Sequence, residues 1–322
     1  MKVISEQEVL RQFTVVDAIK TIERCFIDFD RGRIMQWPRS VTTLPDGLNQ
    51  NVFALMPAYL GGERLYGAKI MSFFPDNLEK SLPTHLGQII LLSSETGETK
   101  ALIDANSVTW LRTAAVSAVA TDKLAKKEAS TLSLIGAGNQ AASHLQAIRH
   151  VRPITRVVVF DLDKQRQHDF VERAKSDFPG LTILGAETLT EATENIDIIC
   201  TLTPSMHPFL TGDMVSAGAH INAIGSFSPE KRELTTDLIS AAKVFVDDYE
   251  AALKESGDIL IPVLEGSFDE DSIAGSLSEL VTSKVTGRST ENDITIFDAV
   301  GLAVEDLYCA SAIYQKMTRM VK

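Results

Sequence analysis

The sequence has little of what a disulfide framework, a metal site or a membrane span needs. Its 322 residues include only three cysteines, Cys25, Cys200 and Cys309, which are scattered and form neither a disulfide framework nor a zinc-binding pattern. Its six histidines do not show the HExxH spacing of a zinc-binding helix. No apolar run reaches the roughly eighteen residues of a transmembrane helix, and the charged N-terminal segment does not resemble a signal peptide. We therefore expect a cytoplasmic protein with no metal.

Positive charge is also scarce. The chain has 31 Lys and Arg residues against 43 Asp and Glu residues, which gives a formal net charge of −12. An acidic surface repels phosphates and anionic lipids, so we expect neither nucleic acid nor a membrane as a partner. The 44% hydrophobic content of 322 residues is enough for two cores, and two domains are expected.

The most informative segment lies near the middle of the chain. Thr131–Ile135 predicts a short buried strand, and residues 139–150 predict a helix. Between them, Gly136 allows the chain to turn and Gly138 allows the backbone to approach a pyrophosphate, while Ala141 is a permitted third small residue. Unpaired N–H groups at the start of such a helix attract phosphates. This order of elements predicts a dinucleotide-binding site.

The residue after the next strand bears on which dinucleotide binds. Arg156–Phe160 predicts a strand, and Asp161 follows it 23 residues after the second glycine of the turn. A carboxylate there accepts hydrogen bonds from the ribose hydroxyls and repels a 2′-phosphate, which favours NADH over NADPH. Lys164 and Arg166 follow closely and leave NADPH open. The alternative role for Asp161 is an N-cap of the helix predicted from Lys164 to Lys175.

The pattern of elements predicts an α/β fold with two domains. Strands and helices alternate from residue 131 to about residue 248, which predicts a Rossmann-type, doubly wound parallel sheet. We place this dinucleotide-binding domain at residues 121–296. The first 120 residues combine helices with strands in turn-rich loops, and the tail is helical from Gly301. Residues 1–120 and 297–322 are therefore expected to form one α+β substrate-binding domain.

Three basic residues lie among neighbours that are typical of a protein interior. Arg39 follows Trp37 and Pro38 in a loop, Lys69 lies inside a predicted strand, and Arg112 lies in a helix of small apolar residues. Each needs an anion, because an unpaired buried cation costs several kcal/mol. One explanation is internal ion pairs with Asp or Glu. The other is that all three converge on a substrate carboxylate, or that Arg112 binds the cofactor phosphates, which suits the bidentate guanidinium.

Several segments together resemble the ornithine cyclodeaminase/mu-crystallin family along essentially the whole chain. The matching blocks are Pro38–Ser40, Gly67–Lys69, Leu111–Ala118, Gly136–Ala141, Gly218–Gly225, Glu250–Asp258 and Ile296–Asp306. The resemblance implies a Rossmann domain with bound NAD(P)(H) and a substrate domain that also forms a homodimer. It implies that Arg39, Lys69 and Arg112 bind the α-carboxylate and the adjoining nitrogen of the substrate. It further implies cofactor contacts at Thr84, Asn139, Gln140, Asp161, Thr203 and Lys231.

Two positions depart from the pattern of the cyclodeaminases in this family. Those enzymes carry an aspartate after the fifth strand, where this chain has Phe227, and a glutamate before Leu-Met-Pro, where it has Ala54. A phenyl ring cannot transfer protons, and a methyl group cannot pair with an ammonium. Both substitutions remove what a flexible diamino acid needs, and ketimine reductases of the family also lack the aspartate.

We therefore predict NAD(P)H-dependent reduction of a cyclic imino acid, Δ1-pyrroline-2-carboxylate or Δ1-piperideine-2-carboxylate, to L-proline or L-pipecolate. Lys69 either supplies the imine proton or only holds the carboxylate. The alternatives are an ornithine cyclodeaminase, an alanine-type amino-acid dehydrogenase and an NAD(P)H-binding protein without turnover. His85 and His220 are weaker candidates for a catalytic base, because core histidines are commoner.

Overall fold

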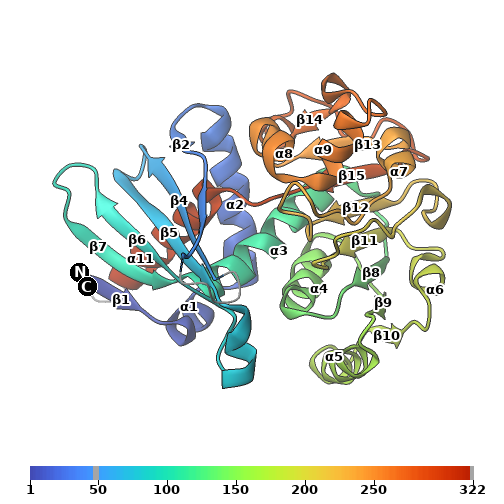
Figure 1. The fold of residues 1–322 in the computed structure, drawn as a ribbon, viewed down its shortest axis with the longest axis horizontal. Coiled ribbons are helices and arrows are strands. Elements are labelled where there is room, and N and C mark those ends of the chain that lie inside the picture. The colour runs from blue at the N-terminus through green and yellow to red at the C-terminus, as the bar shows by residue number, and fades with distance from the viewer. Residues whose placement is uncertain (46–50, 320–322) are drawn as a thin grey trace. The chain divides into compact units, whose positions relative to one another are not determined.

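The chain divides into two compact units (Figure 1). Unit 1 contains Met1–Arg112 and Leu302–Lys322, and unit 2 contains Thr113–Gly301. The structure, a computed structural model, describes residues 1–45 and 51–319, so the last three residues of the predicted C-terminal segment lie outside it. No helix in these described ranges is both long and apolar enough to cross a membrane. The three cysteines are free and buried.

Unit 2 is built on a sheet in which all pairings are parallel. Among the described residues its strands lie in the order β10-β9-β8-β11-β12-β15-β13-β14. The chain moves outward from β8 to β10 and then returns to place β11 on the other side of β8, so the strand order reverses at the β8/β11 boundary. This is the predicted doubly wound sheet, and ligands bind at such a boundary. The strands are β8 (Thr131–Ile135), β9 (Arg156–Phe160), β10 (Thr182–Gly185), β11 (Ile198–Thr201), β12 (His220–Ala223), β13 (Lys243–Val246), β14 (Gly275–Ser276) and β15 (Thr295–Asp298).

The central strands β11, β12 and β15 of this sheet are buried along their full length, because helices connect the parallel strands and cover both faces. The helices are α4 (Asn139–Val151), α5 (Lys164–Asp177), α6 (Leu189–Thr193), α7 (Thr236–Ala241), α8 (Tyr249–Glu255), α9 (Gly257–Leu264) and α10 (Leu277–Val281). The predicted β8, α4 and β9 are confirmed to within one residue. Strand β15, which lies between β12 and β13, was not predicted, since it lies beyond the segment to about residue 248 in which strands and helices were expected to alternate.

Unit 1 is built on a largely antiparallel sheet. Its described strands lie in the order β1-β7-β6-β5-β4-β2, and β3 also pairs with β4. They are β1 (Lys2–Ile4), β2 (Ile34–Gln36), β3 (Ser40–Thr43), β4 (Val52–Leu60), β5 (Leu65–Phe73), β6 (His85–Ser93) and β7 (Thr99–Asp104). The helices are α1 (Glu6–Gln12), α2 (Val15–Asp30) and α11 (Ala303–Arg319), while α3 (Ala105–Leu124) begins in unit 1 and continues into unit 2.

The C-terminal helix lies against the sheet that the N-terminal part of the chain forms. Helix α11 packs on β4, β5 and β6 and beside α2 (Figure 1). The strand register pairs Lys69 of β5 with Met56 of β4 and with Ile89 of β6. Because side chains alternate along a strand, Lys69 and Ala54 point to the same face of the sheet, which is the face that carries α11. This arrangement brings Lys69 of β5 close to the first turn of α11.

Candidate functional site

A cluster of four buried charges lies in unit 1. The ammonium Nζ of Lys69 lies 2.6 Å from Oδ2 of Asp306. Arg112 donates from Nε to Oδ1 of Asp306 at 3.0 Å and from Nη1 to Oε2 of Glu305 at 2.9 Å. Lys69 and Arg112 are 4% and 7% exposed, and both carboxylates are 0% exposed. Three segments that are distant in the chain, β5, α3 and α11, therefore meet through side-chain charges.

Burial and mutual attraction set opposite trends in the protonation of this cluster. Burial, together with nearby Arg112 and Arg39, lowers the pKa of Lys69 to about 8 against the opposing effect of Asp306. Burial also raises the pKa of Glu305 to about 7, because Arg112 offsets that desolvation only in part. The pKa of Asp306 is held below its ordinary value, since its two cationic partners outweigh the effect of burial. Asp306 is thus the fixed anion of the cluster, whereas Lys69 and Glu305 titrate near neutral pH.

Of the three predicted cations, the structure brings Lys69 and Arg112 to one carboxylate. Both make the internal ion pairs that were one of the two explanations for their burial. Arg39, which precedes β3 and is partly buried, lies close enough to lower the pKa of Lys69. Binding of a substrate carboxylate by these residues stays a prediction.

Sequence reasoning missed the two acids. Glu305 and Asp306 stand side by side in a helix whose neighbouring residues are apolar and buried. The argument that singled out the cations applies equally to them, because a buried carboxylate also needs a partner. That signal was present in the sequence, although their contact with Lys69 and Arg112 was not.

The glycine turn of unit 2 has the geometry of a phosphate-binding loop. Gly136 has a φ of +103°, and a Cβ there would lie 2.9 Å from the carbonyl oxygen of Leu202, so a side chain is excluded. Gly138 is exposed, has nothing within 4 Å of an added Cβ, and is the N-cap of α4 without a side-chain cap. The start of α4 thus has open space beside Gly138, and a helix start of this kind attracts an anion. These residues suit a dinucleotide.

Asp161 stabilises this turn through hydrogen bonds to backbone N–H groups. Its carboxylate accepts hydrogen bonds from the backbone N–H of Ala137 at 2.8 Å and from that of Asp163 at 2.8 Å. The N-cap of α5 is Asp163, whose side chain accepts from the N–H groups of Gln165 and Arg166. The alternative role of Asp161 as that N-cap is therefore wrong, because the helix begins two residues later than an Asp161 cap requires. Nη1 of Arg166 lies 3.8 Å from Asp161 and reduces its negative potential.

In unit 2, the buried acid Glu233 links two loops at the carboxyl ends of β11 and β12 by hydrogen bonds. Its Oε1 accepts from the N–H and the hydroxyl of Thr203 at 2.8 and 2.6 Å, and its Oε2 accepts from the N–H of Gly225 at 2.9 Å. Asp258 in turn accepts from the N–H of Glu233 at 2.8 Å. Thr203, a predicted cofactor contact, is thus held by a residue that sequence reasoning did not identify. No pattern in the sequence pointed to Glu233.

The other predicted residues have mixed surroundings. Thr84 precedes β6 in unit 1, and its hydroxyl lies 3.0 Å from Nδ1 of His85. Asn139 and Gln140 open α4. Lys231 follows β12, and its Nζ lies 5.3 Å from the centre of the ring of Phe227, which is 47% exposed.

His220 is a core residue, as the commoner role predicted. It is 0% exposed, and its Nδ1 lies 3.0 Å from the hydroxyl of Thr295. Burial lowers the pKa of His220 to about 3, so the ring stays neutral.

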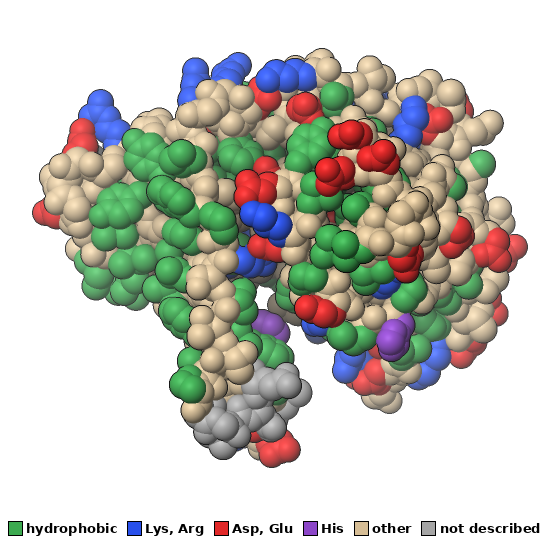
Figure 2. Space-filling model, turned by 45° about the horizontal axis from the view of Figure 1, so that its top comes forward, with side chains coloured by type: hydrophobic (Ala, Val, Ile, Leu, Met, Phe, Trp, Pro, Cys, Tyr) green, Lys and Arg blue, Asp and Glu red, His purple; other side chains and the backbone are tan. Residues whose placement is uncertain are grey.

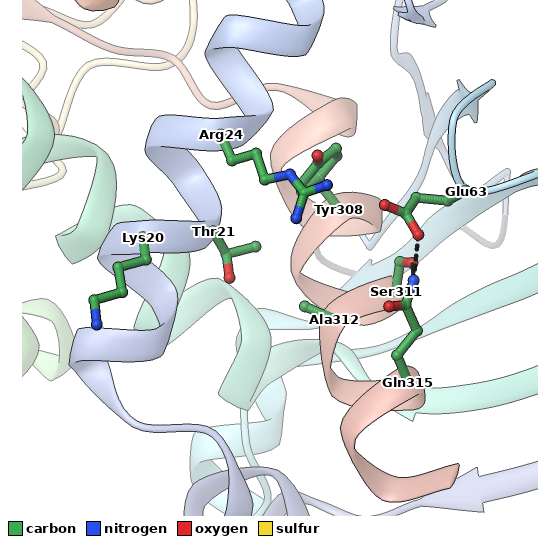
Figure 3. A pocket seen from close by; sticks show the side chains of 8 residues that line it. All are labelled: Lys20, Thr21, Arg24, Glu63, Tyr308, Ser311, Ala312 and Gln315. Atoms are coloured by element: carbon green, nitrogen blue, oxygen red, sulfur yellow. Dashed lines mark hydrogen bonds between the residues drawn. The ribbon is translucent and has the colours of Figure 1, made fainter. Parts of the chain in front are cut away.

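Unit 1 also has a cavity of about 200 Å³ between α2 and α11 (Figure 3). It is lined by Lys20, Thr21, Arg24, Glu63, Tyr308, Ser311, Ala312 and Gln315. Figure 3 shows the carboxylate of Glu63 bonded to Gln315 and the guanidinium of Arg24 directed toward Tyr308. None of the three predicted cations lines this cavity. Helix α11 therefore presents Glu305 and Asp306 to the charged cluster and other residues to this cavity.

The similarity to known proteins extends over both units of the chain. Residues 1–320 match the model of the ornithine cyclodeaminase/mu-crystallin family. The Delta(1)-pyrroline-2-carboxylate reductase of Colwellia psychrerythraea is 33% identical over 319 residues, which cover 98% of this chain and 99% of that protein.

Two solved structures are similar over the full length. The Thermococcus litoralis Delta(1)-pyrroline-2-carboxylate reductase in complex with NADH and L-proline has a TM-score of 0.95 at 33% identity and covers 100% of this chain and 98% of its own. An archaeal alanine dehydrogenase dimer with bound NAD has a TM-score of 0.93 at 30% identity and covers 100% of this chain and 97% of its own.

Proposed function

Because the chain belongs to the ornithine cyclodeaminase/mu-crystallin family, we propose that it is an NAD(P)H-dependent reductase of a cyclic imino acid. The substrate is Δ1-pyrroline-2-carboxylate or Δ1-piperideine-2-carboxylate, and the product is L-proline or L-pipecolate. The observation that carries this proposal is the full-length likeness to a reductase that binds NADH and L-proline. Phe227 and Ala54 support it, since neither can do the work of the carboxylates that a cyclodeaminase uses.

Residues of unit 2 are suited to hold the cofactor, which supplies a hydride to the C=N carbon when it is bound. The turn at Gly136 and Gly138 and the start of α4 take the pyrophosphate, and Asp161 takes the ribose hydroxyls. Asp161 favours NADH, while Arg166, 3.8 Å away, leaves NADPH as the second choice. The further contacts are Thr84, Arg112, Asn139, Gln140, Thr203 and Lys231.

Residues of unit 1 hold the substrate. Arg112 uses two of its five N–H donors on Asp306 and Glu305 and presents others to the substrate carboxylate, to which Arg39 adds positive charge. Lys69, with a pKa of about 8, is mainly protonated at neutral pH and holds a proton for the imine nitrogen. Fixing the planar imine in this way lowers the entropic cost of hydride transfer.

We also propose a homodimer that buries one face of the unit 1 sheet. Phe53, Tyr66 and Leu86 point to the face opposite Lys69 and are 40%, 37% and 45% exposed. Figure 2 shows hydrophobic side chains gathered on the part of the surface that unit 1 forms. A second copy is the proposed occupant, since the alanine dehydrogenase of the same fold is a dimer. Light scattering should give twice the monomer mass, and Phe53→Asp should reduce it, whereas a monomeric wild type rejects this dimer.

One assay tests the reaction. NADH and NADPH oxidation is measured with Δ1-pyrroline-2-carboxylate, Δ1-piperideine-2-carboxylate, and pyruvate plus ammonia, and proline formation is measured from ornithine plus NAD⁺. We expect turnover of a cyclic imine and negligible proline from ornithine, because general acid/base help worth roughly 10²–10⁴-fold is missing at Phe227. Ornithine turnover as fast as imine reduction would reject the proposal, and inactivity in every arm would favour a binding protein.

Amino-acid dehydrogenation is the second candidate. It is favoured by the archaeal alanine dehydrogenase, which covers the whole chain at 30% identity. Faster turnover of pyruvate plus ammonia than of either imine would establish it. The cytoplasmic location stays a prediction that this assay does not address.

A further inference from the structure

Among the described residues of the unit 1 cluster, positive and negative charges are equal. Lys69 and Arg112 carry two positive charges, and Glu305 and Asp306 carry two negative charges when all four are ionised. Arg39 adds a further positive charge, but it is partly exposed and therefore screened by solvent. A carboxylate that binds beside Arg112 thus enters a site that already contains two anions, and its charge is poorly compensated.

Two described oxygens of the cluster make no hydrogen bond, Oδ2 of Asp306, which pairs with Nζ of Lys69, and Oε1 of Glu305, which has no ion pair either. Oε2 of Glu305 accepts from Arg112, whereas Oε1 is buried and makes no hydrogen bond. An ionised buried oxygen without a donor is unfavourable, but a protonated carboxyl carries its own hydrogen there. The titratable and charged groups that face Glu305 come from four elements. They are Arg112 on α3, Lys69 on β5, Cys25 on α2, and Asp306 and Cys309 on α11.

We propose that Glu305 takes up one proton from solvent when the carboxylate of a substrate with an uncharged imine nitrogen binds beside Arg112, and releases it when the site empties. The proton forms an O–H bond at Oε1, while Oε2 still accepts from Nη1 of Arg112. The added positive charge balances the charge of the ligand carboxylate, so the cluster is neutral again in the complex. The identity of the ligand rests on the proposed function.

Glu305 is then a positioning residue that acts through Arg112. The other members cannot easily replace it. Asp306 faces both cations, which hold its pKa low, and burial raises the pKa values of Cys25 and Cys309 well above the neutral range. The pKa of Glu305, raised to about 7 by burial, means that both of its forms are populated at neutral pH.

The test measures proton uptake during ligand binding. NADH-loaded protein is titrated calorimetrically with pyrrole-2-carboxylate, a planar analogue whose ring nitrogen does not titrate near neutrality. Two buffers with different ionisation enthalpies report the number of protons taken up. For the wild type we expect about half a proton per site at pH 7, and a Kd that weakens about fourfold from pH 6 to pH 7.5, below the range in which Lys69 titrates.

Glu305→Gln is neutral at every pH and keeps the acceptor for Arg112. We expect no proton uptake, a flat pH dependence, and binding at pH 7.5 that is at least as tight as that of the wild type. A merely structural role predicts weaker binding at every pH with an unchanged slope, and that result would overturn the proposal. Glu63→Gln is the control, because Glu63 contacts Gln315 of the same helix outside the cluster (Figure 3).

Two further outcomes are decisive. If Glu305→Gln does not fold, the ligand-induced infrared difference spectrum of the wild type should gain a protonated-carboxyl band, and its absence rejects the proposal. Imine turnover is measured separately. Turnover without proton uptake rejects only the role of Glu305, whereas proton-linked binding without turnover of any imine rejects the proposed function.

Discussion

The glycine turn of unit 2 and the charged cluster of unit 1 are built in opposite ways. The turn consists of consecutive residues between β8 and α4, and it presents backbone N–H groups whose positions follow from the start of a helix. The cluster joins β5, α3 and α11 through side chains of residues up to 237 positions apart, from Lys69 to Asp306. The turn is a local site. It should tolerate substitutions at neighbouring positions, whereas a side chain at Gly136 is excluded. A non-local site depends on each partner, because every charge in it is buried.

The largest expected effect follows from removing Arg112. Arg112→Ala should lower kcat/KM at least about 100-fold, roughly 3 kcal/mol of transition-state stabilisation, because the substrate loses its bidentate partner. It also leaves two buried carboxylates short of a cation, so the free energy of unfolding should fall by about 3–5 kcal/mol. Steady-state kinetics on protein shown by circular dichroism to be folded, with denaturant unfolding, measures both.

Arg64→Ala is the control for Arg112, because Arg64 pairs with Glu95 on the surface. Both activity and stability should stay nearly unchanged there. Near-normal kcat/KM in Arg112→Ala would mean that Arg112 has a structural role alone.

A smaller effect is expected at the turn. Gly136→Ala forces a side chain to a φ of +103° and toward the carbonyl oxygen of Leu202, which should cost about 1–3 kcal/mol and weaken NADH binding about tenfold. Fluorescence titration with NADH measures this. Gly62→Ala, which has open space and ordinary φ, should bind NADH normally. Equal affinities of the two variants would contradict the geometry of the turn.

The pH dependence isolates one member of the cluster. Because the pKa of Lys69 is lowered to about 8, kcat/KM should fall as pH rises through about 8 and the ammonium loses its proton. The decline should approach about tenfold per pH unit. In the Glu305→Gln background, where Glu305 no longer titrates, Lys69→Arg keeps its charge throughout this range and should remove the decline. A decline that persists in Lys69→Arg would assign it to another group.

The smallest expected effect is a change in cofactor preference. Asp161→Ala removes the ribose partner and the repulsion of a 2′-phosphate, so it should weaken NADH more than NADPH by a few-fold. Asp163→Ala, the matched control, removes the N-cap of α5 and an exposed ion pair with Arg166 but leaves the carboxylate of Asp161 in place, and it costs about 1 kcal/mol of stability. The dissociation constants of NADH and NADPH are measured for each variant. An unchanged ratio of the two constants in Asp161→Ala would exclude a role of Asp161 in cofactor selection.

Much of unit 2 could be predicted because its signals are local. The strand before Gly136, the helix after it and the strand before Asp161 each follow from a few adjacent residues. The edge strand β1 and strand β15 could not be predicted, since β1 has only three residues and β15 lies beyond the segment in which strands and helices were expected to alternate. Their position is decided by pairing with strands from elsewhere in the chain.

For the site, the sequence by itself determined which residue types need an explanation. It showed cations at positions 39, 69 and 112 among apolar neighbours, and a glycine turn that suits a pyrophosphate. Only the tertiary structure decided that Asp306 lies between Lys69 and Arg112, that Glu305 keeps one oxygen without a partner, and that Asp163 rather than Asp161 caps α5. The reason is physical: backbone geometry is set by neighbours in the chain, whereas the partner and the pKa of a buried charge are set by whatever segment packs against it.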